Sequence, residues 1–407
     1  MYYSYNKDVF LVKGLANDAI YDLLSGKLYH LKKSEGAVLE KIIGKKDTDE
    51  FSEKELSAIN QLQELHLIIK TEKIENADIK SRGKDTYIKF AWIEVCTTCN
   101  LKCKHCYNES SPKTKSFLSL EEFKNICSQL KEIGVTKIQL IGGEPFCHND
   151  ILKMLEMGSK NFEFVEVFTN GTLLDFDRCK FLKENNIKVA LSVYSYMPEE
   201  HDKVTTVQGS HKKTCNTIKN LKDLGVTYRI ATTHMNGISI GEKNTELFSI
   251  HLKKDVVRIA GRANLHLLTE TLLKRKLITK ETFSHKLDKT RILENTRINH
   301  CFGTKIYISS NLDVFPCAME RRFSHGNLKK ERLKNLIKSE IRYMNKDMID
   351  DCKFCELRYA CYDCRPDSLS DSKFAKPYFC TYDVYSGTWE NLDTFAKKCI
   401  FGDLYDE

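Results

Sequence analysis

From residue 89 onward, the pattern of apolar and polar residues alternates between two types. Short apolar runs typical of strands begin at residues 89, 137, 164, 188, 228 and 256. Stretches with helical spacing lie between them, most clearly over 119–134, where Ser119 and Glu122 form a capping box and Gly134 ends the helix. This alternation predicts a parallel α/β sheet with its ligand site at the carboxyl ends of the strands. Six such units are too few for a closed eight-stranded barrel.

The first 78 residues follow a different pattern, which predicts a small α+β domain. Strands are expected at 9–14, 19–24, 27–31 and 67–70. Helices are expected over 34–44 and 52–68, and the side chain of Ser52 can cap the second one at the amide of Glu55. A charged stretch with little apolar periodicity follows, and we place a linker at 79–88.

Composition narrows the class of protein. The chain has 407 residues and 41% hydrophobic content, which supports folded domains with a conventional core. It has no basic segment followed by an apolar run at its start and no stretch of roughly 18 apolar residues, so we expect a cytoplasmic protein without a membrane partner. The net charge of +8 is spread over 64 basic and 56 acidic residues, so nucleic acid is not an expected partner. Sixteen cysteines in such a chain indicate metal or redox chemistry.

Three cysteines follow the first strand of the parallel region. Cys99, Cys103 and Cys106 have the spacing Cys-x3-Cys-x2-Cys. A 4Fe-4S cluster needs four ligands, so three thiolates leave one iron open to a small molecule. The loop resembles that of the radical S-adenosylmethionine (SAM) superfamily, whose fold is a partial (β/α)6 barrel. The resemblance implies that the open iron binds SAM and that an electron from the cluster cleaves SAM to a 5'-deoxyadenosyl radical. A zinc or disulfide loop is the alternative.

The second strand leads into the sequence IGGEP. Its residues Gly142, Gly143 and Glu144 resemble the superfamily's GGE element, which implies contact with the SAM amino group. The resemblance implies further SAM contacts at His105, Asn170, Ser192, Asn236 and Ile259. Ordinary structural roles are the alternative, because Asn170 can end its strand in a turn, Ser192 can be a satisfied core hydroxyl and Ile259 can be core packing.

Seven further cysteines lie between residues 301 and 380 and resemble the SPASM extension, which carries auxiliary 4Fe-4S clusters. The resemblance implies one auxiliary cluster at Cys301, Cys317 and Cys364 with an unidentified fourth ligand, and a second at Cys352, Cys355, Cys361 and Cys380. The expected cofactors are therefore three 4Fe-4S clusters and SAM. A structural zinc site at Cys352, Cys355, Cys361 and Cys364 is the alternative. No catalytic side chain is identified, although Glu320, Asp313 and Asp363 are candidate bases. Sulfatase-maturing enzymes of the family that this region resembles have an acidic residue at the position of Ala318, so that activity is disfavoured.

The N-terminal domain contains the sequence YDLLSGKLYHL. It resembles the winged-helix-like leader-peptide recognition domain of the pyrroloquinoline quinone pathway. That resemblance implies a partner, a precursor peptide bound as an added strand. A structural cap is the alternative. The domain boundaries we expect are 1–78 for leader recognition, 89–262 for the partial barrel, 263–300 for a bridging region, 301–385 for SPASM and 386–407 for a C-terminal helix.

Together these resemblances predict a radical SAM peptide maturase that oxidatively forms a cross-link, thioether or ether bond in a ribosomally made precursor. It would need an electron donor such as flavodoxin or ferredoxin. The alternatives are a radical SAM enzyme acting on a protein or small metabolite, a peptide epimerase, and a zinc-binding interaction protein.

Overall fold

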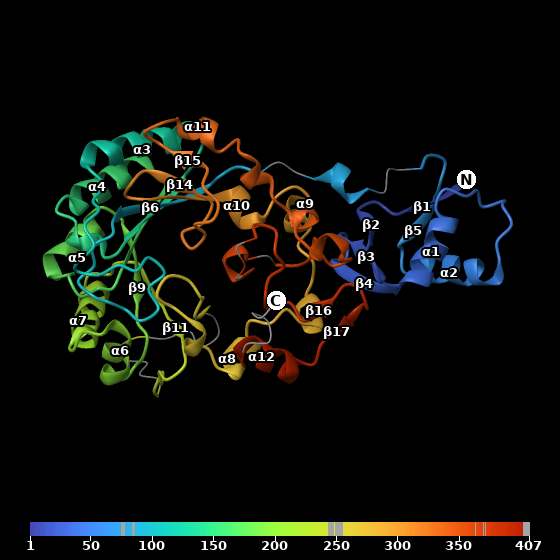
Figure 1. Cartoon of the computed structure of the whole chain (residues 1–407). Helices are drawn as coiled ribbons and strands as arrows, with labels where there is room; N and C mark the ends of the chain where they lie inside the picture. Colours follow the sequence, from blue (N-terminus) through green and yellow to red (C-terminus); the bar gives the residue numbers. More distant parts are fainter. Residues whose placement is uncertain are drawn as a thin grey trace.

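The structure is a computed structural model that describes residues 1–74, 78–83, 86–242, 248, 255–362, 364–368, 370 and 372–401. Figure 1 shows a curved sheet with its helices at one end of the molecule and the N-terminal strands at the other, with C-terminal segments between them. No described helix has the length and apolar character that crossing a membrane requires.

Five of the six strands that the alternating pattern predicts lie side by side and parallel in the main sheet. Their order is β10-β9-β8-β7-β6. The strands are β6 (Phe90–Cys96), β7 (Lys137–Gly142), β8 (Phe164–Thr169), β9 (Lys188–Ser192) and β10 (Tyr228–Ala231). The helices on its outer face are α3 (Leu120–Glu132), α4 (Ile151–Asn161), α5 (Phe176–Glu184), α6 (Pro198–Thr205) and α7 (Ser210–Asp223) (Figure 1). The predicted cap of α3 is confirmed, because the Ser119 hydroxyl accepts from the Glu122 amide and the Glu122 carboxylate accepts from the Ser119 amide.

The sixth predicted strand is shorter than the apolar run suggests. The structure has β12 (Asp255–Val256), which pairs in parallel with β11 (Thr233–His234). Because β11 begins two residues after β10 ends, β12 lies beside the continuation of the fifth strand. Beyond Val257 the chain turns, with the amide of Ala260 donating to the carbonyl of Arg258, so the predicted strand over 256–260 is wrong in its second half.

The other edge of the sheet is extended by the C-terminal part of the chain. β13 (Lys305–Ile308) pairs in parallel with β6, and β14 (Asp313–Phe315) and β15 (Gly326–Asn327) follow in antiparallel order. Ile306, Ile308 and Val314 join the same buried core as the barrel strands. The sequence pattern did not indicate this addition.

The N-terminal domain contains the predicted elements and one more strand. These elements are β2 (Val9–Lys13), β3 (Asn17–Asp22), β4 (Lys27–Lys32), α1 (Lys33–Ile42), α2 (Glu53–Glu64) and β5 (Ile68–Thr71). The additional strand, β1 (Tyr2–Tyr5), pairs antiparallel with β5. One face of the β2-β3-β4 sheet packs on α1 and α2, and the other packs on C-terminal residues such as Leu357 and Tyr359.

Short elements make up much of the remaining chain. They are α8 (Glu270–Lys274), α9 (Lys289–Asn295), α10 (His300–Thr304), α11 (Leu333–Leu336), β16 (Tyr382–Asp383), β17 (Thr388–Trp389) and α12 (Leu392–Phe401). Single 3-10 turns lie at Ile79–Arg82, Pro145–Cys147, Leu265–Leu267, Lys280–Phe283, Glu340–Tyr343, Lys346–Met348, Cys352–Phe354 and Arg365–Ser368. Trp389, expected in the last helix, lies on β17, whereas Phe395 lies on α12 as expected.

Candidate active site

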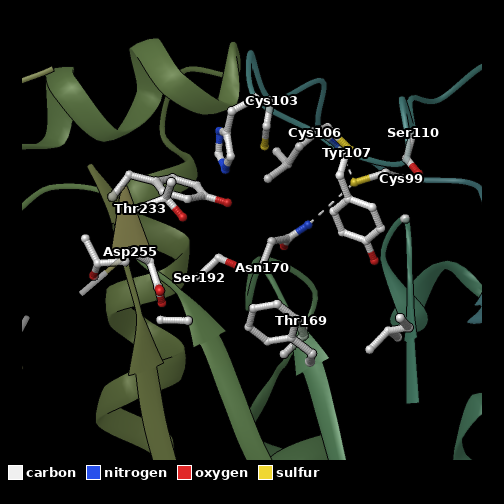
Figure 2. Close-up of a pocket in the computed structure, with 18 of the residues that line it drawn as sticks. Cys99, Cys103, Cys106, Tyr107, Ser110, Thr169, Asn170, Ser192, Thr233 and Asp255 are labelled. Atoms are coloured by element: carbon white, nitrogen blue, oxygen red, sulfur yellow. Dashed lines mark hydrogen bonds between the residues drawn. The ribbon is translucent and has the colours of Figure 1, made fainter. Parts of the chain in front are cut away.

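A cavity of about 360 Å³ opens at the carboxyl ends of the parallel strands, where the fold predicts a ligand site. Eight of the predicted site residues line it: Cys99, Cys103, His105, Cys106, Gly142, Gly143, Asn170 and Ser192. Figure 2 shows the three cysteines on the loop side of the cavity and Ser192, Asn170 and Asp255 at the strand ends facing them.

The three thiols have the chemistry of a cluster site. Burial raises the pKa of the Cys103 thiol to about 12, with a further contribution from Cys106, and burial also raises the pKa of Cys99. The bare thiols of Cys99 and Cys103 therefore stay protonated at neutral pH and release protons when they bind a metal. Among the described residues, no three His, Cys, Asp or Glu side chains converge on the position of one metal ion. Three cysteines around a shared cavity instead fit a larger inorganic group, as a 4Fe-4S cluster is.

Gly142 and Gly143 are required by close contact between β7 and the start of the cysteine loop. A Cβ at Gly142 would lie 2.5 Å from the carbonyl oxygen of Cys96, and one at Gly143 would lie 2.3 Å from that of Thr98. The amides of Gly143 and Glu144 donate to those same two carbonyls at 2.8 and 2.9 Å. The glycines therefore fix the loop on the second strand, in addition to lining the cavity.

Glu144 is placed differently from Gly142 and Gly143. Its side chain is fully buried and does not line the cavity. The carboxylate accepts from the Asn170 amide at 2.8 Å, the Thr169 hydroxyl at 2.7 Å and the Phe146 amide at 3.1 Å. In this arrangement Glu144 ties the end of β7 to the end of β8.

The buried carboxyl of Glu144 predicts a pH-dependent stability. Burial raises its pKa from 4.5 to about 6, although its hydrogen bonds act in the opposite direction. Because the folded pKa is the higher one, the stabilising contribution is full below pH 4.5 and is lost as pH rises through about 6. Relative to Glu144→Gln, the wild-type apoprotein should lose about 2 kcal/mol of stability across this range. Thermal unfolding of both proteins at several pH values measures this; parallel pH curves would contradict it.

Asn170 connects the end of β8 to the cysteine loop. Its side-chain amide donates to Asn100 Oδ1 at 3.0 Å and to Cys99 Sγ at 3.9 Å, the contact drawn in Figure 2. Its side-chain oxygen accepts from the amide of Thr172 at 2.8 Å. Asn170 therefore does both things that the sequence suggested: it stabilises the turn after β8, and it lines the cavity.

His105 and Ser192 meet at an aromatic residue that the sequence did not single out. Tyr194 lines the cavity, hydrogen-bonds to Ser192 and packs edge-on against His105, with ring centroids 4.8 Å apart. Burial, with the nearby charge of Arg262, lowers the pKa of His105 to about 4, so its ring is neutral. These three side chains form one wall of the cavity.

Two predicted SAM contacts lie away from the cavity. Asn236 donates from its side chain to the carbonyl of His266 at 3.0 Å, and Ile259 packs in a buried cluster beside Val257. The same part of the chain instead contributes Val256, Arg258 and Arg262 to the lining, and β10 contributes Arg229. Their positions depend on the turn after β12 and on the inward face of β10, which apolar periodicity does not reveal.

The four cysteines predicted for the second auxiliary cluster gather in the C-terminal region. Cys352, Cys355, Cys361 and Cys380 line one small cavity of about 20 Å³. Lys346 Nζ lies 3.4 Å from Cys361 Sγ and 3.8 Å from Cys352 Sγ. A lysine ammonium suits thiolates that carry negative charge when a metal is bound.

The other three predicted auxiliary ligands are also neighbours. Burial raises the pKa of the Cys317 and Cys364 thiols; the neighbouring Cys301 adds to the shift at Cys317, and Cys317 adds to the shift at Cys364. Cys364 Sγ also lies 2.8 Å from Arg258 Nη1, a group that lines the main cavity. The site predicted for the cluster at Cys301, Cys317 and Cys364 therefore borders the main cavity.

The candidate bases differ in their surroundings. Glu320 is buried and pairs with Arg322 at 2.7 Å, and Asp313 accepts from the Asn327 side chain at 2.8 Å. Asp363 lies outside the described residues. Neither described carboxylate lines the main cavity.

Residues 93–248 match the radical SAM superfamily. This stretch is a radical SAM domain. The predicted radical SAM fold and enzyme class are thereby confirmed.

Three relatives are similar to a larger or smaller share of the chain. AlbA of Bacillus subtilis, an antilisterial bacteriocin subtilosin biosynthesis protein, is 29% identical over 80% of this chain and 78% of its own. A probable GTP 3',8-cyclase of Methanocella arvoryzae is 30% identical over 43% of this chain and 57% of its own. SkfB of Bacillus subtilis, a sporulation killing factor maturation protein, is 28% identical over 38% of each chain.

Two solved structures share the fold of this chain. anSMEcpe with bound AdoMet has a TM-score of 0.53 at 18% identity, covering 78% of this chain and 100% of its own. SuiB of Streptococcus suis, bound to the precursor peptide SuiA, has a TM-score of 0.52 at 15% identity, covering 92% of this chain and 98% of its own. At these identities the likeness concerns the fold.

Proposed function

We propose that this protein is a radical SAM peptide maturase that forms a new bond oxidatively in a ribosomally made precursor peptide. One observation carries the choice of substrate class. The match to AlbA covers 80% of the chain and continues beyond the radical SAM domain, whereas the match to the probable GTP cyclase covers 43%. The parts outside the domain are those that would receive a peptide, so they favour the bacteriocin-related function over a small metabolite.

We assign the cofactors from the donor sets. Cys99, Cys103 and Cys106 would hold the cluster that binds SAM, since all three line the main cavity. Two auxiliary clusters would be held by Cys352, Cys355, Cys361 and Cys380 and by Cys301, Cys317 and Cys364. When bound, the first cluster and SAM supply an electron and a carbon-centred radical that abstracts hydrogen. Flavodoxin or ferredoxin would be a suitable electron donor.

The residues of the chain position this chemistry and shield it. Gly142 and Gly143 fix the loop on β7, and Asn170 fixes it on β8. Tyr194 and His105 form a wall that keeps water from the reacting carbon. Asn170 and Ser192 offer polar atoms at the strand ends, where the methionyl and ribose parts of SAM would lie.

The N-terminal domain would bind the leader of the precursor along β4. Within the described chain, β4 pairs only with β3, so its outer edge has backbone groups to offer an extended peptide. The face of this sheet opposite α1 and α2 is fixed to the C-terminal region, with Tyr21 Oη donating to the carbonyl of Glu356 at 2.9 Å. A bound leader would thus have a defined relation to the cavity.

Strand addition at β4 predicts a local change in amide hydrogen exchange. With saturating leader peptide, the amides of Lys27–Lys32 that point away from β3 should exchange at least about tenfold more slowly, because new backbone hydrogen bonds protect them. β5 is the matched control, since it is also an edge strand of this domain. Equal protection of both strands, or protection only elsewhere, would contradict the assignment of β4.

The proposed function is tested by anaerobic reaction with a short peptide encoded beside the gene. Cross-link, thioether or ether formation removes two hydrogens from the peptide and yields 5'-deoxyadenosine with it. A peptide mass that is unchanged after reaction in H2O, with deuterium incorporated when the reaction is run in D2O, would indicate an epimerase instead. SAM cleavage without any change in the peptide would exclude this peptide as the substrate and favour the metabolite alternative.

A further inference from the structure

The turn after β12 brings residues 258–262, which we call the strap, against the cysteine loop. The amide of Arg262 donates to the carbonyl of Cys106 at 3.1 Å. Gly261 has φ +58°, and a Cβ there would lie 2.5 Å from the carbonyl oxygens of both Cys106 and Tyr107. The strap and the loop are therefore in direct backbone contact, which needs glycine at this position.

The side chain of Arg262 forms hydrogen bonds with the same loop at two further points. Its Nε donates to the carbonyl of Cys103 at 2.9 Å, and its Nη2 donates to the carbonyl of Ser110 at 2.8 Å. Cys103 is a predicted ligand, and Ser110 is a buried residue at the far end of the loop. One planar guanidinium thus spans the loop, a geometry that lysine cannot reproduce.

We propose that Arg262 is a positioning residue that holds the cysteine loop in its cluster-binding shape and sets the reduction potential of the cluster bound there. The inference rests on the proposed assignment of the SAM-binding cluster to Cys99, Cys103 and Cys106. It concerns a residue outside the stretch that matches the superfamily, which ends at residue 248.

Two physical effects support this role. Ordering a loop costs conformational entropy, and hydrogen bonds to three of its carbonyls reduce the entropy that cluster assembly must remove. A cluster gains negative charge on reduction, so a fixed cation beside it favours the reduced state. Arg262 supplies that cation in a partly buried cavity wall, where screening by water is weak.

The charge effect is tested with Arg262→Gln and Arg262→Lys in the reconstituted full chain. Arg262→Gln should lower the midpoint potential of the SAM-binding cluster, followed by its EPR signal in a redox titration. Arg262→Lys should keep the potential near that of wild type, because the positive charge remains. It should weaken SAM binding severalfold, because the two side-chain hydrogen bonds to the cysteine loop are lost. Arg332→Gln is the matched control, since Arg332 is exposed and pairs with Glu132 between α11 and α3. An unchanged potential in a folded, fully loaded Arg262→Gln variant would overturn the proposal.

The backbone contact is tested with Gly261→Ala. Gly134→Ala is its control, because Gly134 also has positive φ (+81°) but has open space where a Cβ would lie. Only Gly261→Ala should reduce the iron bound at the first site after reconstitution, to roughly half or less, since its Cβ collides with the loop. Equal iron loading of both variants would overturn the positioning role. If alanine at the three cysteines leaves iron at this site, the cluster assignment itself fails, which is a different outcome.

Discussion

Alanine at Cys99, Cys103 and Cys106 together is expected to abolish reductive cleavage of SAM. These thiols line one cavity with the glycines and polar side chains at the strand ends, and without them a cluster has no thiolate ligand there. 5'-Deoxyadenosine should fall to the background of a reaction without enzyme. Iron per chain should fall by about one third, because one of three proposed clusters is lost.

The control for this variant is Cys127→Ala. Cys127 is buried on α3 in the barrel core and is not a proposed ligand, so its substitution should keep both iron content and SAM cleavage. If the triple variant still forms 5'-deoxyadenosine, the assignment of the first cluster is wrong. If both variants lose iron, the loss reflects the stability of the barrel, and the assignment loses its support.

The parallel half of the fold could be predicted because its signals are local. Apolar runs identify β6 to β10, and the capping box of Ser119 and Glu122 identifies the start of α3. The addition of β13 to β6 could not be predicted, because the pairing of Tyr307 with Trp92 joins residues far apart in the chain. β1 was missed for the same reason, since its partner β5 lies more than 60 residues away.

The same difference between local and long-range signals applies to the residues of the site. Cysteine spacing and the IGGEP sequence identify the loop and the second strand end, because each signal lies within a few neighbouring residues. Arg229 and Arg262 could not be found this way, since each reaches the cavity only through the way its strand or turn is oriented. The position of Glu144 follows from the motif, but the surroundings of its side chain do not. Its carboxylate accepts hydrogen bonds from Thr169 and Asn170 at the end of the neighbouring strand.

Alanine at Cys352, Cys355, Cys361 and Cys380 is expected to abolish peptide modification while SAM cleavage continues. The four thiols line a cavity separate from that of Cys99, so the first cluster should remain loaded. The expected products are 5'-deoxyadenosine without a mass change in the peptide, because an auxiliary cluster would no longer accept the electron released after hydrogen abstraction. Liquid chromatography with mass detection measures both products in one reaction.

A second reason for this effect lies in how the quartet segment holds the N-terminal domain. The amide of Leu15 donates to the carbonyl of Phe354 at 2.8 Å, and Arg358 Nη1 donates to the carbonyl of Lys13 at 2.8 Å. Loosening residues 352–361 would release the leader-binding sheet from its place relative to the cavity. Because the quadruple variant can lose stability, Cys380→Ala alone is the milder test, and Cys399→Ala is the control from the same buried cluster. Full modification by Cys380→Ala with wild-type iron content would remove Cys380 from the ligand set, whereas loss of modification in Cys399→Ala would show that packing, not a cluster, is what the reaction needs there.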